Sequence, residues 1–300
     1  MNVRILVTAL LFTGAMSTLA AQPLTERYAP FGTVLTPQFA SAPFPHPKRA
    51  AGHTYGGTVF PAERHYSDST VLIVVPKGYV PHETVDIVLY LHGWYNSVDS
   101  ACAQFRLIQQ FAGAKKNAIF VFPEGPKHAP DSFGGKLEEA DGLKELVADV
   151  FRHLKERKLI THARIGRIVL AGHSGAYRAI AFMLLRGGMT PYISDVILFD
   201  ALYGQTEKYA YWLDHYKGRF VAVYTDSGGT KGETENLMAD LDAWKIPYRR
   251  TEDTALTPAV LRGNRLLFIH TALGHNDVIA TQDQFRDFLS TSTLRPLPHR

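Results

Sequence analysis

Two hydrophobic patterns alternate along the chain from residue 54 onward. Short runs rich in valine, isoleucine, leucine and phenylalanine are mostly separated by stretches long enough for a helix. The clearest helix is predicted over residues 137–157, where Leu143, Leu146, Val147, Val150, Phe151 and Leu154 form one apolar stripe. The predicted strands are "GGTVF" (56–60), "STVLIVVP" (69–76), "DIVLYLHG" (86–93), "NAIFVFPEG" (117–125), "RIVLAGHS" (167–174), "VILFDALYG" (196–204), "FVAVYTD" (220–226) and "RLLFIHT" (265–271).

The make-up of these runs indicates how the strands are arranged. They are apolar on both alternating faces, which is typical of a parallel sheet covered by helices on both sides. The first two runs lie close together, so we expect them to form an antiparallel edge. The sequence therefore predicts the α/β fold class: one three-layer domain over residues 54–300, with a mostly parallel sheet of eight strands.

The N-terminus has the pattern of an exported protein. "MNVR" is positive, "ILVTALLFTGAM" is apolar, and "STLAAQP" supplies small residues, which together predict a signal peptide over residues 1–21, cleaved after Ala20 or Ala21. The apolar run is shorter than the ~20 residues of a membrane span. We therefore expect no stable membrane anchor and a periplasmic or secreted protein. Residues 22–53 are rich in proline and predict an arm that lies extended on the domain or is partly disordered.

Charge and cysteine content narrow the function further. Lysine and arginine number 32 against 28 acidic residues, and the surplus of +4 is spread along the chain without a dense basic run. Nucleic-acid binding is therefore not expected. Cys102 is the only cysteine, so no internal disulfide can form, and we expect a buried, inert thiol. No histidine or cysteine spacing indicates a metal site, and a monomer without a cofactor is expected.

The stretch "AGHSGAYR" (171–178) carries the strongest chemical signal. It follows an apolar run and precedes a helical pattern, and small residues flank Ser174, as a tight strand-to-helix turn around a nucleophile requires. The last position of the motif is Ala176 where G-x-S-x-G has glycine. His275 follows the last predicted strand in "GHND", where Gly274 lets the loop bend. A serine hydroxyl needs such an imidazole to take its proton during attack.

The order of these features resembles a known superfamily. Ser174, a later aspartate and His275, together with "LHGWYN" at the end of the third strand, resemble the α/β-hydrolases over about residues 54–290. The resemblance is strongest to secreted esterases of the feruloyl-esterase-like and polyhydroxyalkanoate-depolymerase-like groups. It implies an oxyanion hole formed by the backbone N–H groups of Gly175 and Trp94.

Two aspartates are candidates for the acid of the triad. Asp226 follows the seventh predicted strand, at the position that most α/β-hydrolases use, and glycines behind it could turn its loop toward His275. Asp200 follows the sixth strand, at the minority position. The sequence favours Asp226 and keeps Asp200 as the alternative.

Aromatic residues crowd the predicted rim of the site and bear on the substrate. Tyr95, Tyr177 and Tyr203 are expected to contact it. Only one helix fits between the sixth and seventh strands, so no large lid is expected. The expected substrate is a small-molecule or polymeric ester, and an uncovered site suits large or polymeric substrates better than small buried ones. The leading hypothesis is an exported serine esterase. The alternatives are an amidase or peptidase acting on cell-wall or peptide material with the same triad, and a non-catalytic binding protein of the same fold.

Overall fold

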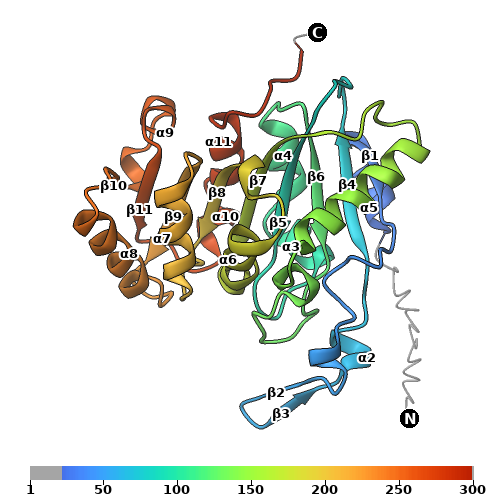
Figure 1. The fold of residues 1–300 in the computed structure, drawn as a ribbon, viewed down its shortest axis with the longest axis horizontal. Helices are drawn as coiled ribbons and strands as arrows, with labels where there is room; N and C mark the ends of the chain where they lie inside the picture. The colour runs from blue at the N-terminus through green and yellow to red at the C-terminus, as the bar shows by residue number, and fades with distance from the viewer. Residues whose placement is uncertain (1–21, 299–300) are drawn as a thin grey trace, which may run out of the picture.

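A nine-stranded sheet forms the centre of the computed structural model, which describes residues 22–298 (Figure 1). The strand order is β1-β4-β6-β5-β7-β8-β9-β11-β10, and only β4 runs antiparallel to its neighbours. The predicted fold class is therefore confirmed. The strands of this sheet are β1 (Gly32–Leu35), β4 (Val71–Pro76), β5 (Val85–Leu91), β6 (Ala118–Pro123), β7 (Ile165–His173), β8 (Ile193–Phe199), β9 (Arg219–Thr225), β10 (Arg249–Glu252) and β11 (Leu266–Thr271).

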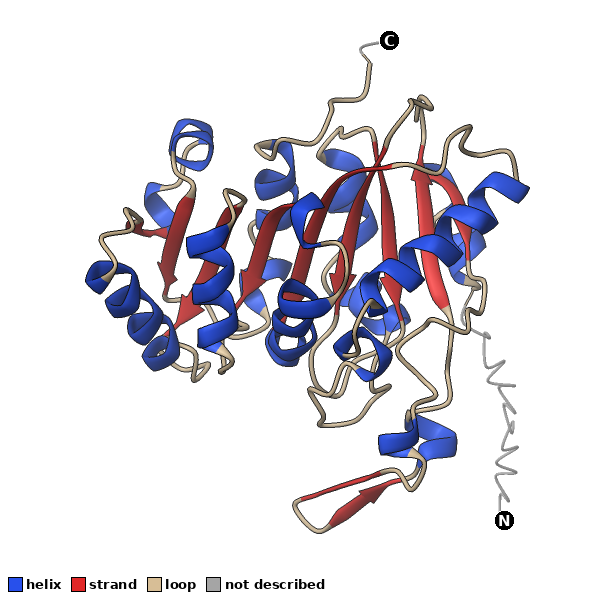
Figure 2. Ribbon diagram, in the orientation of Figure 1, coloured by secondary structure: helices blue, strands red, loops and turns tan. Residues whose placement is uncertain are grey.

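Helices cover both faces of the sheet (Figure 2). One face packs against α5 to α8, and the other against α3, α4, α10 and α11. Every residue of β4, β5 and β6 is buried, which explains why these runs are apolar on both alternating faces. The helices are α1 (Leu24–Arg27), α2 (Ala62–His65), α3 (Val98–Gln104), α4 (Leu107–Gly113), α5 (Gly142–Glu156), α6 (Tyr177–Arg186), α7 (Thr206–His215), α8 (Lys231–Ala243), α9 (Pro258–Gly263), α10 (Asp277–Ala280) and α11 (Gln284–Ser290).

The antiparallel edge differs from the prediction. β4 pairs with β1, which comes from the proline-rich arm, and not with the "GGTVF" run. That run contains β3 (Thr58–Phe60), which pairs only with β2 (His53–Tyr55) in a separate hairpin. The proline-rich arm therefore supplies a strand to the sheet. The ninth strand, β10, was also not predicted, because its "RRTE" sequence is polar and largely exposed at the sheet edge.

The β2–β3 hairpin and α2 project from the end of the domain at which the parallel strands finish (Figure 1). Only α7 lies between β8 and β9, so no lid is inserted there, as predicted. Among residues 22–298, no helix is long and apolar enough to cross a membrane. The predicted signal peptide lies outside these residues.

Candidate active site

Ser174 lies where β7 passes through one 3₁₀ turn (Ser174–Ala176) into α6. Its φ is 53°, a left-handed conformation that is strained for any residue with a side chain. Two glycines make room for it. A Cβ on Gly172 would lie 2.6 Å from Cβ of Ala176, and a Cβ on Gly93 would lie 2.5 Å from Cβ of Ser174. The backbone around Ser174 therefore has the geometry of a nucleophile elbow.

The imidazole of His275 is paired with Asp200. His275 lies between β11 and α10, and its Nδ1 is 2.6 Å from Oδ2 of Asp200, which follows β8 and is fully buried. Thr225 and Thr230 donate hydrogen bonds to the same carboxylate. Burial raises the pKa of Asp200, but the hydrogen bonds from His275, Thr230 and Thr225 outweigh it, so the pKa lies below its usual value. Asp200 is therefore an ionised acceptor for the Nδ1 proton.

Asp226, the acid that the sequence favoured, does not face His275. Its carboxylate accepts a hydrogen bond from Lys231 Nζ at 2.7 Å and lies 3.1 Å from Nε2 of His270, and its side chain is 57% exposed. The placement of Asp226 beside His275 is wrong, and the alternative, Asp200, has that position. The glycines behind Asp226 have another use: a Cβ on Gly228 would lie 1.8 Å from Oδ2 of Asp200. Gly228 therefore makes room for the Asp200 carboxylate.

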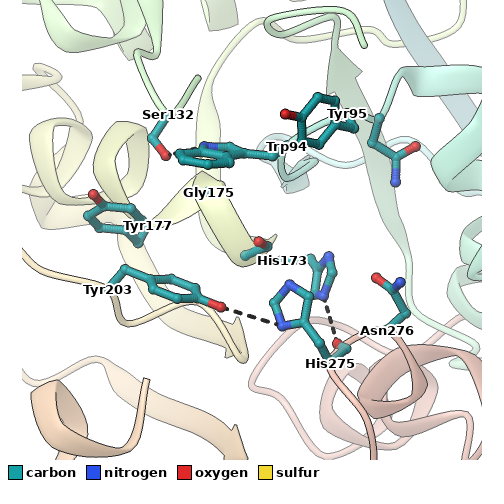
Figure 3. Close-up of a pocket in the computed structure, with 11 residues that line it drawn as sticks. Trp94, Tyr95, Ser132, His173, Gly175, Tyr177, Tyr203, His275 and Asn276 are labelled. Carbon is teal, nitrogen blue, oxygen red and sulfur yellow. Dashed lines mark hydrogen bonds between the residues drawn. The ribbon is translucent and has the colours of Figure 1, made fainter. Parts of the chain in front are cut away.

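Ser174 and His275 line one cavity of about 640 Å³ (Figure 3). Among the described residues, the Ser174 hydroxyl and the His275 imidazole are not hydrogen-bonded to each other. Such bonds are often long in a free enzyme and shorten when substrate binds. No group of three or more His, Cys, Asp or Glu residues within 22–298 could hold a metal ion. The other residues that line the cavity are Trp94, Tyr95, Asn96, Ser132, His173, Gly175, Tyr177, Tyr203 and Asn276.

Of the aromatic residues expected at the rim, Tyr95, Tyr177 and Tyr203, which were expected to contact substrate, line this cavity together with Trp94. Three others expected there, Tyr209, Tyr211 and Trp212 of α7, do not line it, and Tyr209 and Trp212 are fully buried. The indole of Trp94 lies over Gly175, where an added Cβ would come within 2.5 Å of Trp94 Cδ1, and its Nε1 donates to Ser132 Oγ at 2.8 Å. The hydroxyl oxygen of Tyr203 lies 3.5 Å from Nδ1 of His275 (Figure 3). The same hydroxyl donates its proton to the carbonyl of Gly228. Burial, and then the nearby Asp200 charge, raise the pKa of Tyr203. The hydroxyl is therefore neutral beside the histidine.

His173 is a residue of the site that the sequence analysis overlooked. Its Nε2 donates to the backbone carbonyl of His275 at 2.9 Å, and the two imidazole centres are 4.5 Å apart. Burial, followed by the proximity of His275, lowers the pKa of His173 to about 3. A neutral His173 thus holds the loop of His275 against the elbow. The only signal in the sequence was its place directly before the serine.

Comparisons with known proteins support the fold. No protein-family model and no curated protein matches the sequence. Solved structures do match. A feruloyl esterase module from Clostridium thermocellum superimposes with a TM-score of 0.53 at 11% identity, covering 90% of each chain. Fluorophosphonate-binding serine hydrolase F of Staphylococcus aureus gives 0.52 at 9% identity, and a ferulic acid esterase gives 0.53 at 10%; each match covers 87% of this chain and 98% of the other. The chain therefore has an α/β-hydrolase fold of the type found in these esterases.

Proposed function

We propose that this protein is an exported serine esterase that works through an acyl-enzyme intermediate. The observation that carries the proposal is the combination of a strained Ser174 on a nucleophile elbow and an Asp200–His275 pair that open onto the same cavity. A binding protein has no need for a buried, ionised carboxylate behind a histidine at a nucleophile elbow. Export is proposed from the N-terminal pattern of residues 1–21.

The proposed reaction assigns one role to each group. Nε2 of His275 takes the Ser174 proton while Oγ attacks the ester carbonyl, and Asp200 holds the Nδ1 proton and stabilises the imidazolium that forms. The backbone N–H groups of Gly175 and Trp94 stabilise the oxyanion. His275 then returns the proton to the leaving alcohol. In the second half His275 takes a proton from water as its oxygen attacks the acyl carbonyl, and it returns the proton to Oγ of Ser174 as the acyl–Oγ bond breaks and the carboxylic acid leaves.

The cavity favours esters of considerable size. The gap between β8 and β9 holds α7 alone, and aromatic rings of Trp94, Tyr95, Tyr177 and Tyr203 form much of the wall. Flat rings of this kind pack against the faces of aromatic acyl groups and sugars. The fluorophosphonate-binding and feruloyl-esterase proteins of similar fold are consistent with this substrate class.

Labelling and turnover together test the proposal. Purified mature protein is treated with a fluorophosphonate probe and assayed with p-nitrophenyl esters, and Ser174→Ala is compared with the wild type. We expect labelling and turnover in the wild type and a loss on the order of 10⁴-fold or more in the variant. Matched anilide substrates distinguish an amidase from an esterase. An intact Ser174→Ala protein that keeps its activity would remove the serine from this role, and a wild type that neither labels nor turns over would favour a binding protein.

A further inference from the structure

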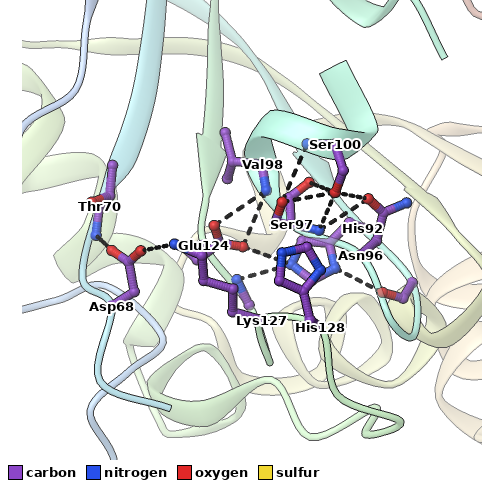
Figure 4. A network of polar contacts seen from close by, with 12 residues as sticks. Asp68, Thr70, His92, Asn96, Ser97, Val98, Ser100, Glu124, Lys127 and His128 are labelled. Atoms are coloured by element: carbon purple, nitrogen blue, oxygen red, sulfur yellow. Dashed lines mark hydrogen bonds and ion pairs between the residues drawn. The ribbon is translucent and has the colours of Figure 1, made fainter. Parts of the chain in front are cut away.

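His92 and Glu124 form a buried histidine–glutamate pair close to the start of α3 (Figure 4). His92 follows β5 and Glu124 follows β6, and the two strands are neighbours in the sheet. Nε2 of His92 is 3.0 Å from Oε1 of Glu124, and the two side chains are 1% and 4% exposed. Neither residue lines the active-site cavity, so the proposed chemistry gives them no direct part.

Nδ1, on the other side of the His92 ring, fixes the peptide group between Gly93 and Trp94. This nitrogen is 2.7 Å from the carbonyl oxygen of Gly93. Since a carbonyl can only accept, Nδ1 carries the proton. In a trans peptide the carbonyl and the following N–H point to opposite sides. Holding the Gly93 carbonyl on His92 therefore directs the Trp94 N–H away from the ring.

The backbone N–H of Trp94 lies close to Ser174. Gly93 packs directly on Ser174, because an added Cβ there would lie 2.5 Å from Cβ and 3.1 Å from Oγ of the serine. Among the hydrogen bonds of residues 22–298, the N–H of Trp94 has no partner. An unpaired donor beside the nucleophile is what an oxyanion hole requires.

Glu124 ties down both ends of the same loop. It contacts His92 at the start, and its two oxygens accept from the N–H of Val98, the first residue of α3, at 3.1 and 3.2 Å. Between these points Tyr95 N–H donates to the Ala129 carbonyl at 3.0 Å. Residues 92–98 are thus closed into a rigid loop by one buried carboxylate.

The geometry points to His92 and Glu124 as a clasp that orients the Gly93–Trp94 peptide for oxyanion stabilisation. This inference rests on the proposed esterase function. Both are positioning residues, since they act through the Trp94 N–H. Nε2 of His92 also lies 3.2 Å from the N–H of Gly125, so the ring is held between the Gly93 carbonyl on one side and Glu124 and Gly125 on the other.

Two amide variants of His92 separate the clasp from simple packing. In His92→Asn the amide nitrogen can take the place of Nδ1 and keep the bond to Gly93. In His92→Gln it can take the place of Nε2 and keep only the contact with Glu124. We expect kcat to fall about 10²–10³-fold in His92→Gln, the cost of losing one oxyanion donor, with KM within about threefold of the wild type. His92→Asn should recover most of kcat.

A transition-state analogue supplies a second readout. A trifluoromethyl ketone forms a tetrahedral adduct with the serine and needs the same oxyanion donors, so its affinity should fall in parallel with kcat in His92→Gln. Glu124→Ala should change both quantities in the same direction, and Glu124→Gln, which still accepts from Val98, should stay closer to the wild type.

Asp195→Asn is the matched control for loss of a buried carboxylate. Asp195 is paired with Arg219 at 2.6 Å at the start of β8, the opposite end of the strands from the cavity. It should lower thermal stability and leave kcat and inhibitor affinity unchanged. Equal kcat in the two His92 variants, or a loss confined to stability or to KM, would overturn the clasp. Wild-type turnover and its loss in Ser174→Ala test the esterase function separately.

Discussion

Three histidines near the elbow show how contacts decide the role of one residue type. His275 is partly exposed to the cavity and has an ionised carboxylate on Nδ1. His173 is buried, and its Nε2 donates to the carbonyl of His275. His92 is buried, and its Nδ1 donates a hydrogen bond to the Gly93 carbonyl. His92 also has a carboxylate neighbour, Glu124, but it does not line the cavity. Only His275 combines a carboxylate partner with exposure to the cavity, so of the three it is the one placed to move a proton in the proposed reaction.

The first prediction concerns the acid that pairs with His275. Asp200→Asn should lower kcat by about 10⁴-fold, because an amide cannot stabilise the imidazolium and favours the wrong tautomer. Asp226→Asn should stay within about threefold of the wild type, since its carboxylate contacts Lys231 and His270 at the surface. Both variants are assayed with one ester, and circular dichroism checks their folding. A large loss in Asp226→Asn with an active Asp200→Asn protein would reverse the assignment.

The sequence predicted the serine and the histidine of the site but not the choice of acid. Small residues around Ser174 and its place after an apolar run are local signals. The choice of acid depends on how two loops turn in space. Asp200 turns inward with a φ of 43°, and Gly228 leaves space for its carboxylate. No sequence pattern near Asp200 indicates either feature.

The β2–β3 hairpin is the element that extends the cavity rim. Tyr55 at its tip packs edge-to-face on Trp94, with ring centres 5.1 Å apart, and Phe60 lies 6.3 Å from Tyr95. Tyr55 and Tyr95 are 47% and 57% exposed, so the hairpin adds an exposed aromatic ring beside the cavity-lining Trp94. Within residues 22–298 the hairpin pairs with no other strand, so these ring contacts help to hold it against the cavity rim.

The second prediction tests the Tyr55 ring. Tyr55→Ala should raise KM for an ester with an aromatic acyl group by about 3–10-fold, the effect of losing one aromatic pair, and leave kcat within about twofold. KM for p-nitrophenyl acetate should change less, because a short acyl group does not reach the hairpin. Tyr211→Ala is the control, since Tyr211 is similarly exposed on α7 and stacks only on His215. Equal KM values for wild type and Tyr55→Ala on both esters would contradict a role of the hairpin.

At this scale the sequence predicted buried strands well and edges poorly. Apolar runs such as 86–91 and 118–122 are unambiguous because burial on both faces demands them. β1 and β10 are edge strands of four residues with exposed positions. They are strands because they pair with a neighbour, and they lack the apolar run that burial would require. The "GGTVF" run fails for a related reason, because its three paired residues belong to an isolated hairpin.

In the whole molecule, the site sits at the junction of the two cores that flank the sheet. The elbow passes from β7 into α6, on one face, while the loop of His275 leads into α10 on the other. His173 joins the two through its bond to the His275 carbonyl, and its ring packs against Phe105 with centres 5.0 Å apart. Burying this imidazole unprotonated therefore couples the stability of the whole fold to pH.

The last prediction follows from the sign of that coupling. Because the pKa of His173 is about 3 in the folded protein and 6.5 without the fold's influence, the unfolded chain binds a proton that the folded chain excludes. Its contribution to stability is complete above pH 6.5 and is lost as the pH falls toward 3, with a slope of up to about 1.4 kcal/mol per pH unit. Carboxylates also contribute to the pH dependence of stability, so a variant is needed to isolate the part that comes from His173.

His173→Gln is that variant, because its amide nitrogen can keep the bond to the His275 carbonyl and does not titrate. Urea unfolding between pH 4 and 7 should show a shallower loss of stability on acidification in His173→Gln than in the wild type. His162→Gln, in an exposed loop, controls for the loss of a histidine as such and should follow the wild-type curve. Parallel curves for His173→Gln and the wild type would mean that His173 is protonated equally in the folded and unfolded chains. Its role as the neutral link between the loops of Ser174 and His275 would then fail.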